Sequence, residues 1–242
     1  MSFSQLPAAV LFDLDGTLID SEPLWFEAER RLAADYGQSW SAQDAEQLVG
    51  WSLWDCATFF QDRIGVDLPQ PVIIDRMQSH VLAGVEAAPL WRPGAVELLT
   101  EVRAAGVPTG LVTMSYRELT DAVVAALPDG SFQAVVSGDE VTRGKPHPDP
   151  YLLAAERLGV DPLDCVAIED SVTGATSARD AGCAVLVVPA VVPVNHLAGV
   201  AVVSSLSGMT LADLGGVLQR HRVELAQSDS PAGSSSGVAA SG

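Results

Sequence analysis

Five short apolar runs limit the folds that are open to this chain. Within them the hydrophobic residues are nearly continuous rather than alternating with polar ones, which is typical of strands covered on both faces. Stretches with helical character separate the later runs, and this order favours an α/β fold with a parallel sheet and crossover helices. The runs lie at residues 8–12, 107–112, 132–136, 165–168 and 184–188.

The gap between the first two runs is too long for a simple crossover. Roughly ninety residues lie there, whereas a parallel crossover needs about a dozen. Amphipathic or helical patterns within the gap lie at 22–36, 42–48, 53–63 and 72–85. We therefore expect an all-helical domain at 21–89, inserted into a core formed by 1–20 and 90–225. A final helix is predicted at 210–223, and residues 226–242 have the composition of a disordered tail.

The overall charge excludes some classes of partner. The chain has 31 acidic against 13 basic residues, which argues against binding to nucleic acid or to an anionic membrane surface. The apolar stretch at 183–194 is interrupted by Pro189 and Pro193 and is too short to cross a bilayer. The N-terminus lacks the basic segment of a secretory signal, and the three cysteines are widely spaced and odd in number. These features predict a cytoplasmic protein without a disulfide framework and leave its oligomeric state open.

Two acids follow the first apolar run directly. Asp13 and Asp15 stand in the segment DLDGT, just beyond the predicted strand. Open α/β folds hold their ligands at this carboxyl end of the sheet, and Gly16 lets the chain turn away without a side chain that blocks the site. Taken alone, the pair could also be an ordinary strand-to-loop junction. Taken with the groups after the later strands, it indicates a site.

Further polar groups follow the later strands. Thr113, Met114 and Ser115 offer a hydroxyl and backbone amides at the start of a helix, which suits phosphate oxygens, although a threonine there is often only a cap. Lys145 lies in a tight loop between Gly144 and Pro146, and the acidic pair Glu169-Asp170 ends the fourth run. Carboxylates that converge at one edge repel one another unless a cation lies among them. Oxygen ligands of this kind select Mg²⁺.

The ordered segments DLDGT, LVTMS, GKPHPDPY and IEDSVTG resemble the four motifs of the haloacid dehalogenase superfamily of phosphatases and phosphomutases. The resemblance covers residues 10–188 and implies a Rossmann-like core with a small helical cap. It also implies that Asp13 is the nucleophile and a metal ligand, and that Asp15 is the general acid/base with its main-chain carbonyl on the metal. The phosphoryl group would be held by Thr113, the amides of Met114 and Ser115, and Lys145. Glu169 and Asp170 would complete the Mg²⁺ site.

The same resemblance narrows the reaction. Dehalogenases of the superfamily lack an acid at the position of Asp15, because a halide leaves without a proton, so we expect phosphotransfer. The segments DSEPLW and LGVDPLDCVAIEDSV are similar to sugar-phosphate phosphatases of the superfamily. β-Phosphoglucomutase uses a cap arginine to hold a second phosphate, and Leu53 stands where that arginine is expected. The favoured prediction is hydrolysis of a small phosphate monoester through an aspartyl-phosphate. A phosphomutase and a non-catalytic module that binds a phosphorylated metabolite remain the alternatives.

Contacts between the predicted cap and the substrate are the least determined part of the site. Glu22, Trp51, Trp54 and Asp55 are candidates, because aromatic faces and carboxylates suit a sugar; equally, both tryptophans could pack inside the helical domain. Gly50 is a candidate hinge for cap closure, although glycine is more commonly a helix terminator.

Overall fold

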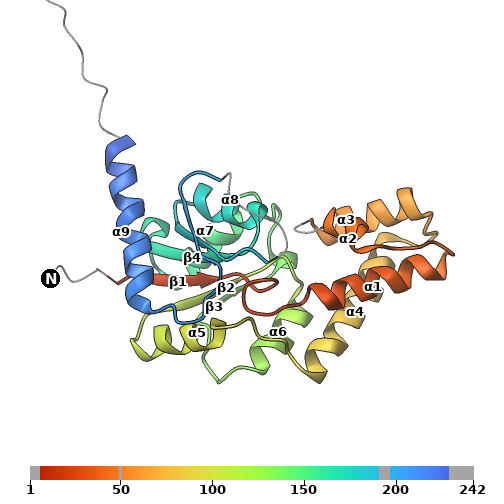
Figure 1. Cartoon of the computed structure of the whole chain (residues 1–242), viewed down its shortest axis with the longest axis horizontal. Coiled ribbons are helices and arrows are strands. Elements are labelled where there is room, and N and C mark those ends of the chain that lie inside the picture. Colours follow the sequence, from red (N-terminus) through yellow and green to blue (C-terminus); the bar gives the residue numbers. More distant parts are fainter. Residues whose placement is uncertain (1–5, 49–50, 191–196, 229–242) are drawn as a thin grey trace, which may run out of the picture.

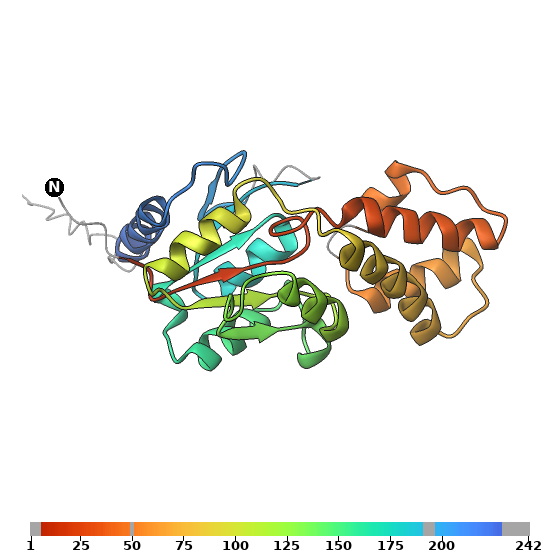
Figure 2. The same ribbon diagram turned by 90° about the horizontal axis from the view of Figure 1, so that it is seen from below.

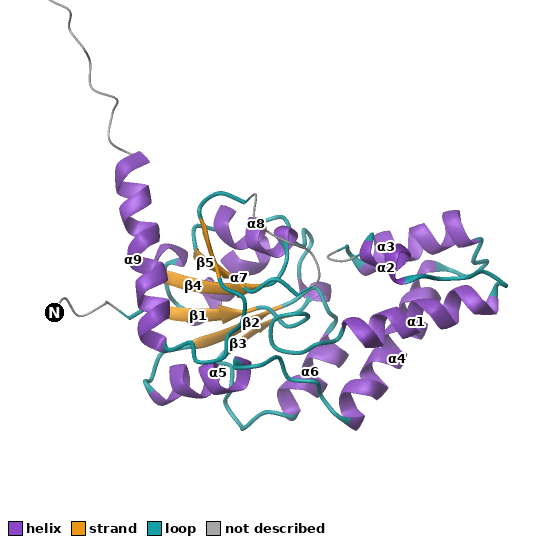
Figure 3. Ribbon diagram, in the orientation of Figure 1, coloured by secondary structure: helices purple, strands orange, loops and turns teal. Residues whose placement is uncertain are grey.

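A parallel sheet of six strands, in the order β3-β2-β1-β4-β5-β6, forms the centre of the protein (Figures 1 and 3). This computed structural model describes residues 6–48, 51–190 and 197–228. The predicted α/β parallel sheet is confirmed. The strands are β1 Ala9–Phe12, β2 Thr109–Val112, β3 Ala134–Val136, β4 Cys165–Glu169, β5 Ala184–Val187 and β6 Val200–Val202.

Strand β6 was not predicted from the sequence. It has only three residues, and two are half-buried and one is exposed, so it lacks the continuous apolar run that marks a covered strand. By contrast, every residue of β1, β2, β4 and β5 is buried. β6 is recognisable only by its parallel pairing with β5, in which Val185 lies opposite Val200.

Helices cover both faces of the sheet. Alternate residues of β1 point to opposite sides, so that Val10 and Phe12 belong to one hydrophobic cluster and Ala9 and Leu11 to the other. The first face is covered by α5 (Ala95–Ala104), α6 (Arg117–Ala125) and α9 (Leu211–Ser228). The second face is covered by α7 (Asp149–Leu158) and α8 (Val172–Asp180).

The inserted segment is entirely helical and lies beyond the carboxyl ends of the strands, set apart from the sheet (Figure 2). It consists of α1 (Glu22–Asp35), α2 (Ala42–Glu46), α3 (Leu53–Phe59), a π-helical turn (Phe60–Ile64) and α4 (Gln70–Ala87). The helix predicted at 53–63 therefore changes from α to π geometry at Phe60. It ends at Gly65, whose φ of 80° is in the left-handed region.

Two chain segments join the insert to the core, and backbone hydrogen bonds tie them together. Asp20 N–H donates to Leu90 O at 2.7 Å, and Arg92 N–H donates to Leu18 O at 2.8 Å. The insert is thus connected through one paired hinge rather than through two independent linkers. Gly50, the hinge suggested by the sequence, lies outside the described residues.

Helix α9 continues to Ser228, past the predicted helix end at 223 and past the predicted start of the tail at 226. Its buried residues Leu211, Leu214 and Leu218 pack on the core, which outweighs the weak helix propensity of Gly215 and Gly216. The rest of the predicted tail, 229–242, lies outside the described residues. None of the helices in the described ranges combines the length and apolar character needed to cross a membrane.

Candidate active site

Asp13, Thr113 and the pair Glu169-Asp170 lie together because the strands that precede or contain them, β1, β2 and β4, are neighbours in the sheet. β1 pairs with β2 on one side and with β4 on the other, and Phe12 lies opposite both Leu111 and Ile168. Asp13, which follows β1, is therefore level with the acidic end of β4. Its N–H donates to Ile168 O at 3.0 Å. The register of these three strands therefore brings the groups at their carboxyl ends to one edge of the sheet.

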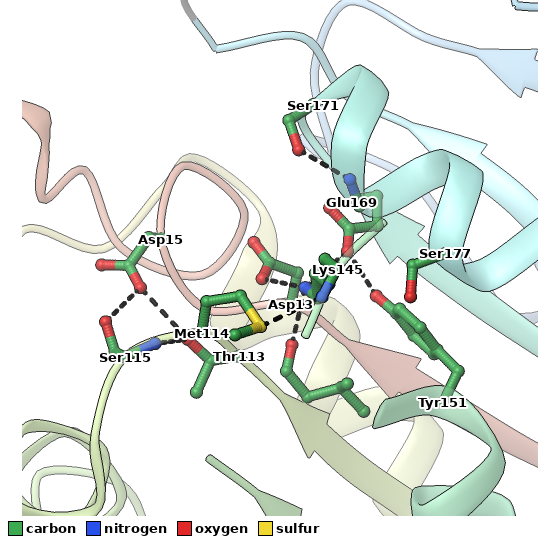
Figure 4. Close-up of polar contacts among 12 residues, drawn as sticks. Asp13, Asp15, Thr113, Met114, Ser115, Lys145, Tyr151, Glu169, Ser171 and Ser177 are labelled. Carbon is green, nitrogen blue, oxygen red and sulfur yellow. Dashed lines mark hydrogen bonds and ion pairs between the residues drawn. The ribbon is translucent and has the colours of Figure 1, made fainter. Parts of the chain in front are cut away.

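Lys145 reaches this edge from the loop before α7 and is buried there (Figure 4). Its Nζ donates to Asp13 Oδ1 at 2.6 Å, to Glu169 Oε1 at 2.6 Å and to Val112 O at 2.9 Å. The side chain is only 5% exposed, so Lys145 is not an ordinary surface lysine. The hydroxyl of Tyr151 also donates to Glu169 Oε1, and sequence reasoning missed this residue.

Burial and mutual repulsion set the ionisation of the cluster. Burial, followed by the charge of Glu169, raises the pKa of Asp13 to about 7, although Lys145 partly offsets this. Burial and the neighbouring Asp13 and Glu169 raise the pKa of Asp170 well above its ordinary value. Burial acts to lower the pKa of Lys145, but Asp13 and Glu169 outweigh it and the pKa is raised. The ammonium therefore stays charged, and the carboxyls need more positive charge than it supplies.

The donor set fits a divalent cation. Asp13, Glu169 and Asp170 each offer a carboxylate oxygen, and these atoms lie within 4.8 Å of one another. When all three carboxyls are ionised, their charge exceeds that of the Lys145 ammonium by two. Glu169 Oε2 is buried and has no hydrogen-bond partner among the described residues, although buried polar atoms normally have one. A hard cation with oxygen ligands, such as Mg²⁺, satisfies both the charge and the orphaned oxygen.

Two glycines allow the backbone to approach this cluster closely. A Cβ on Gly16, whose φ is +79°, would lie 2.1 Å from Asp170 Oδ2. A Cβ on Gly174, in the first turn of α8, would lie 2.0 Å from Glu169 Oε2. Both positions therefore exclude any side chain, and the space that they leave is next to the carboxylates that could hold the cation.

Asp15 is half-buried and accepts hydrogen bonds from four side chains. Ser21 Oγ and Trp25 Nε1 donate to its Oδ1 at 2.6 and 3.4 Å, and Ser115 Oγ and Thr113 Oγ1 donate to its Oδ2 at 2.7 and 3.2 Å. Ser21 and Trp25 belong to the beginning of the insert and were not singled out from the sequence. The arrangement couples Asp15 to both parts of the protein.

The predicted phosphate-binding groups are in place but are engaged with the protein itself. Besides donating to Asp15, Thr113 Oγ1 accepts the N–H of Ser115 at 2.9 Å, an amide that the sequence suggested for phosphate. Met114 has a role that its amide alone did not suggest, because its sulfur accepts the N–H of Lys145 at 3.3 Å. A Cβ on Gly144 would lie 2.3 Å from Met114 Cε, so the methionine side chain supports the lysine loop.

A cavity joins this cluster to the insert. From the core it is lined by Asp13, Asp15, Thr113, Met114, Ser115, Lys145, Asp170, Ser171, Thr173 and Gly174. From the insert it is lined by Glu22, Trp25, Phe26, Glu29, Ala45, Leu48, Trp51, Leu53, Cys56 and Met77. All predicted core residues except the buried Glu169 therefore face one space, and of the predicted cap contacts Glu22 and Trp51 do so.

Trp54 and Asp55 do not line this cavity. Trp54 is 48% exposed. Asp55 is exposed and borders a separate pocket. Its N–H donates to the hydroxyl of Ser52, the N-cap of α3, and its Oδ2 accepts that hydroxyl's proton. Trp51 is 46% exposed, so packing of both tryptophans inside the insert is also wrong. Trp40 is the tryptophan that is buried there.

Two acids on α1 face the cavity, and sequence reasoning found only one of them. Burial, with Asp15 and Asp20 adding to it, raises the pKa of Glu22 to about 7. Glu29 is 6% exposed and its Oε2 accepts the Trp40 Nε1–H at 2.9 Å. Burial raises the pKa of Glu29 to about 7 as well. Glu29 is seven residues after Glu22, a spacing that puts both on one helix face and could have identified it.

Comparisons with known proteins agree with this architecture. A family model described as a haloacid dehalogenase-like hydrolase matches residues 7–182. Hexitol phosphatase B of Escherichia coli (strain K12) is 34% identical over 221 residues, which are 88% of this chain and 99% of that protein. A bifunctional riboflavin kinase/FMN phosphatase of Arabidopsis thaliana is 33% identical over 207 residues, 81% of this chain, and the match spans 52% of that longer protein.

A solved structure extends the similarity to three dimensions. CbbY from Rhodobacter sphaeroides, crystallised in complex with phosphate, superimposes with a TM-score of 0.78 at 28% identity, over 86% of this chain and 99% of that one. Because the match covers 86% of the chain, it extends beyond the sheet and its covering helices into the helical insert. The chain belongs to the haloacid dehalogenase-like hydrolase family.

Proposed function

We propose that this protein is a Mg²⁺-dependent phosphatase that hydrolyses a small phosphate monoester, in particular a sugar or polyol phosphate, through an aspartyl-phosphate on Asp13. The observation that carries the proposal is the cavity in which Asp13, Asp15, Lys145 and Asp170 meet, between the sheet and the insert. Family membership and the hexitol phosphatase relative support the same reaction and substrate class.

The chemistry follows from the positions of two aspartates. In the first step an Asp13 oxygen attacks phosphorus, and the P–O bond to the leaving alcohol breaks while Asp15 gives that oxygen a proton. In the second step Asp15 takes a proton from a water molecule, which attacks phosphorus and releases inorganic phosphate from Asp13. Asp15 can act as acid in the first step and as base in the second because hydrogen bonds from Ser21, Thr113 and Ser115 hold its carboxyl beside the cavity.

Charge on the transferring phosphoryl group requires compensation. Lys145 supplies a buried ammonium next to Asp13, and hydroxyls and amides from Thr113 to Ser115 lie at the same rim. Asp13, Asp170 and Glu169 are the side chains that would hold Mg²⁺, together with the main-chain carbonyl of Asp15. Bound there, the ion would neutralise the excess carboxylate charge and stabilise the developing charge on the phosphoryl oxygens.

The insert acts as the cap in this proposal, with the predicted boundaries 21–89. It contributes half of the cavity wall, so its approach to the core excludes water from the first step. The paired hinge segments around Asp20 and Leu90 are where such a movement would occur. The cytoplasmic location stays a prediction of the sequence.

The cavity disfavours the phosphomutase alternative. Among the described residues that line it, Lys145 is the sole basic side chain, and it is occupied by Asp13 and Glu169. Leu53, at the position expected for a mutase arginine, faces the cavity. A doubly phosphorylated sugar would therefore place its second phosphate among apolar and acidic side chains, which is unfavourable. The other alternative, a module that only binds a phosphorylated metabolite, would need neither a buried Asp13 nor Asp15 beside the same cavity.

The test measures the release of inorganic phosphate by the wild-type protein and by a variant of Asp13. Purified protein with Mg²⁺ should release phosphate from a panel of sugar and polyol phosphates, and EDTA should stop the reaction. Asp13→Asn should abolish turnover and trapping by fluoroberyllate while it keeps the far-UV circular dichroism spectrum. Asp129→Asn, at an exposed turn outside the cavity, is the matched control and should stay active. Activity retained in Asp13→Asn would refute the nucleophile, and conversion of glucose 1-phosphate to glucose 6-phosphate without phosphate release would establish the mutase.

A further inference from the structure

Glu29 is a buried carboxylate in the wall of the cavity, and the proposed chemistry does not use it. It is 6% exposed, and its Oε2 accepts one hydrogen bond, from Trp40 Nε1. Within the part of the chain that the structure describes, its Oε1 accepts no hydrogen bond and no lysine, arginine or histidine forms an ion pair with it. Burial raises the pKa of this carboxyl to about 7. Above that pH an ionised carboxylate faces the cavity with one oxygen free, and a ligand that donates a hydrogen bond would satisfy it.

Helix α1 sets the distance of Glu29 from the reacting groups. Glu22, in the first turn, lies close enough to Asp15 for their charges to interact. Glu29 is two helical turns further on, about 10 Å along the axis at 1.5 Å per residue. Figure 1 shows that α1 runs outward, away from the sheet. Glu29 therefore marks the end of the cavity that is remote from the phosphoryl group.

The wall around Glu29 consists mainly of apolar side chains. Phe26, Ala45, Leu48, Leu53 and Met77 line the part of the cavity that the insert provides. Among the described lining residues of the insert, Glu22 and Glu29 are the charged ones, and both are acids. A leaving group that ends in phosphate or carboxylate would meet like charge in a poorly hydrated space. A neutral end with a hydroxyl group could donate to the free oxygen of Glu29.

Trp40 fixes the direction of the carboxylate. Its ring is 8% exposed and packs against Phe59 and Phe60, with ring centroids 6.1 and 4.9 Å apart. The indole N–H is a donor only, so it binds Oε2 and leaves Oε1 for the ligand. Trp40 is thus a positioning residue that acts through Glu29.

We propose that Glu29 is a specificity-determining residue, which selects phosphate monoesters whose leaving group is neutral and carries a hydroxyl at its far end and rejects those whose far end is anionic. The inference rests on the proposed phosphatase function and names its substrate class. The spacing of Glu22 and Glu29 along α1, about 10 Å, favours an extended leaving group over a compact one.

Two substrates that differ only at the far end test the inference. Sorbitol 6-phosphate and 6-phosphogluconate share six carbons and a terminal phosphate, but the other end is a hydroxymethyl group in the first and a carboxylate in the second. At pH 8.5, above the raised pKa of Glu29, wild-type protein should favour sorbitol 6-phosphate by about 100-fold in kcat/KM, since like-charge contacts are strongly unfavourable. Equal values for the two substrates would overturn the proposal without any variant.

Glu29→Gln then assigns the preference to this side chain. The amide keeps an oxygen for Trp40 and removes the charge, so the ratio of the two kcat/KM values should fall at least about tenfold. Acetyl phosphate is too short to reach Glu29, and its hydrolysis by Glu29→Gln should match that of wild type. Glu27→Gln is the control variant, because Glu27 lies on the same helix, pairs with Arg30 and Arg31 and does not line the cavity.

The outcomes separate the two proposals. An unchanged ratio in Glu29→Gln, with acetyl phosphate still hydrolysed, overturns the role of Glu29 and leaves the phosphatase intact. Failure of the wild type to hydrolyse acetyl phosphate and both six-carbon substrates overturns the proposed function. A ratio that falls equally in Glu27→Gln would mean that helix α1 responds to any loss of charge, which also refutes a specific role for Glu29.

Discussion

Replacing Lys145 by methionine tests how the acidic cluster is stabilised. The Lys145 side chain is 5% exposed and bridges Asp13 and Glu169, which are 8% and 1% exposed. The variant keeps an unbranched side chain of similar length but removes the ammonium, which leaves three carboxylates without a protein cation. Removal of one partner from a buried ion pair typically costs about 3–5 kcal/mol, and we expect a loss of this size in the free energy of unfolding at pH 8 in EDTA.

The same reasoning predicts how pH and metal change that loss. Burial and Glu169 already raise the pKa of Asp13 to about 7 with Lys145 present, and without the lysine this pKa must rise further. Below it Asp13 binds a proton and the repulsion falls, so the destabilisation should be smaller at pH 6 than at pH 8. Mg²⁺ replaces the missing positive charge and should reduce the loss as well.

Urea unfolding followed by tryptophan fluorescence measures these differences, with the free energy obtained by linear extrapolation. Arg143→Met is the matched control, because Arg143 is in the same loop but is 62% exposed and pairs with Asp149 at the surface; it should cost no more than about 1 kcal/mol. If Lys145→Met also lies within about 1 kcal/mol of wild type in EDTA at pH 8, buried charge repulsion is not what the lysine relieves.

Two further predictions concern the metal and the substrate. The affinity for Mg²⁺ should fall about tenfold from pH 8 to pH 6, because a carboxyl with its pKa raised to about 7 must lose its proton before it binds the ion; calorimetry that shows a constant affinity would contradict the raised pKa of Asp13. Leu53→Arg should lower the inhibition constant of glucose 1,6-bisphosphate about tenfold through a charged hydrogen bond to the second phosphate. With Leu53→Met as the control, no change would remove this position from substrate selection.

The strands that carry the site were predictable, and the reason is their burial. Each of the five predicted runs overlaps a strand, because a strand covered on both faces must be apolar throughout. β6 escaped detection since its side chains are not all covered. Helix α9 forms despite its two glycines because Leu214 and Leu218 pack on the core, and its extension past residue 223 lies in an exposed segment that no buried pattern marks. The local hydrophobic pattern predicted an element reliably where both of its faces had to be apolar, and it predicted the other elements less well.

The sequence by itself determined which side chains of the core meet at the cavity. Asp13, Thr113 and Asp170 each follow a strand of one parallel sheet, and parallel strands end at the same edge, so their side chains had to converge wherever the rest of the chain lay. Lys145 could be included because a rigid loop next to the same edge has few other places to direct its side chain.

Only the tertiary structure decided which residues of the insert line the cavity. Which face of the insert meets the core depends on how its helices pack and on the hinge, and neither is encoded in a local pattern. For this reason Trp54 and Asp55, which looked suitable, lie outside the main cavity, whereas Trp25 and Glu29 line it. A strand end has a direction that the fold class dictates, but a residue on a helix acquires its environment only when another surface is placed against it.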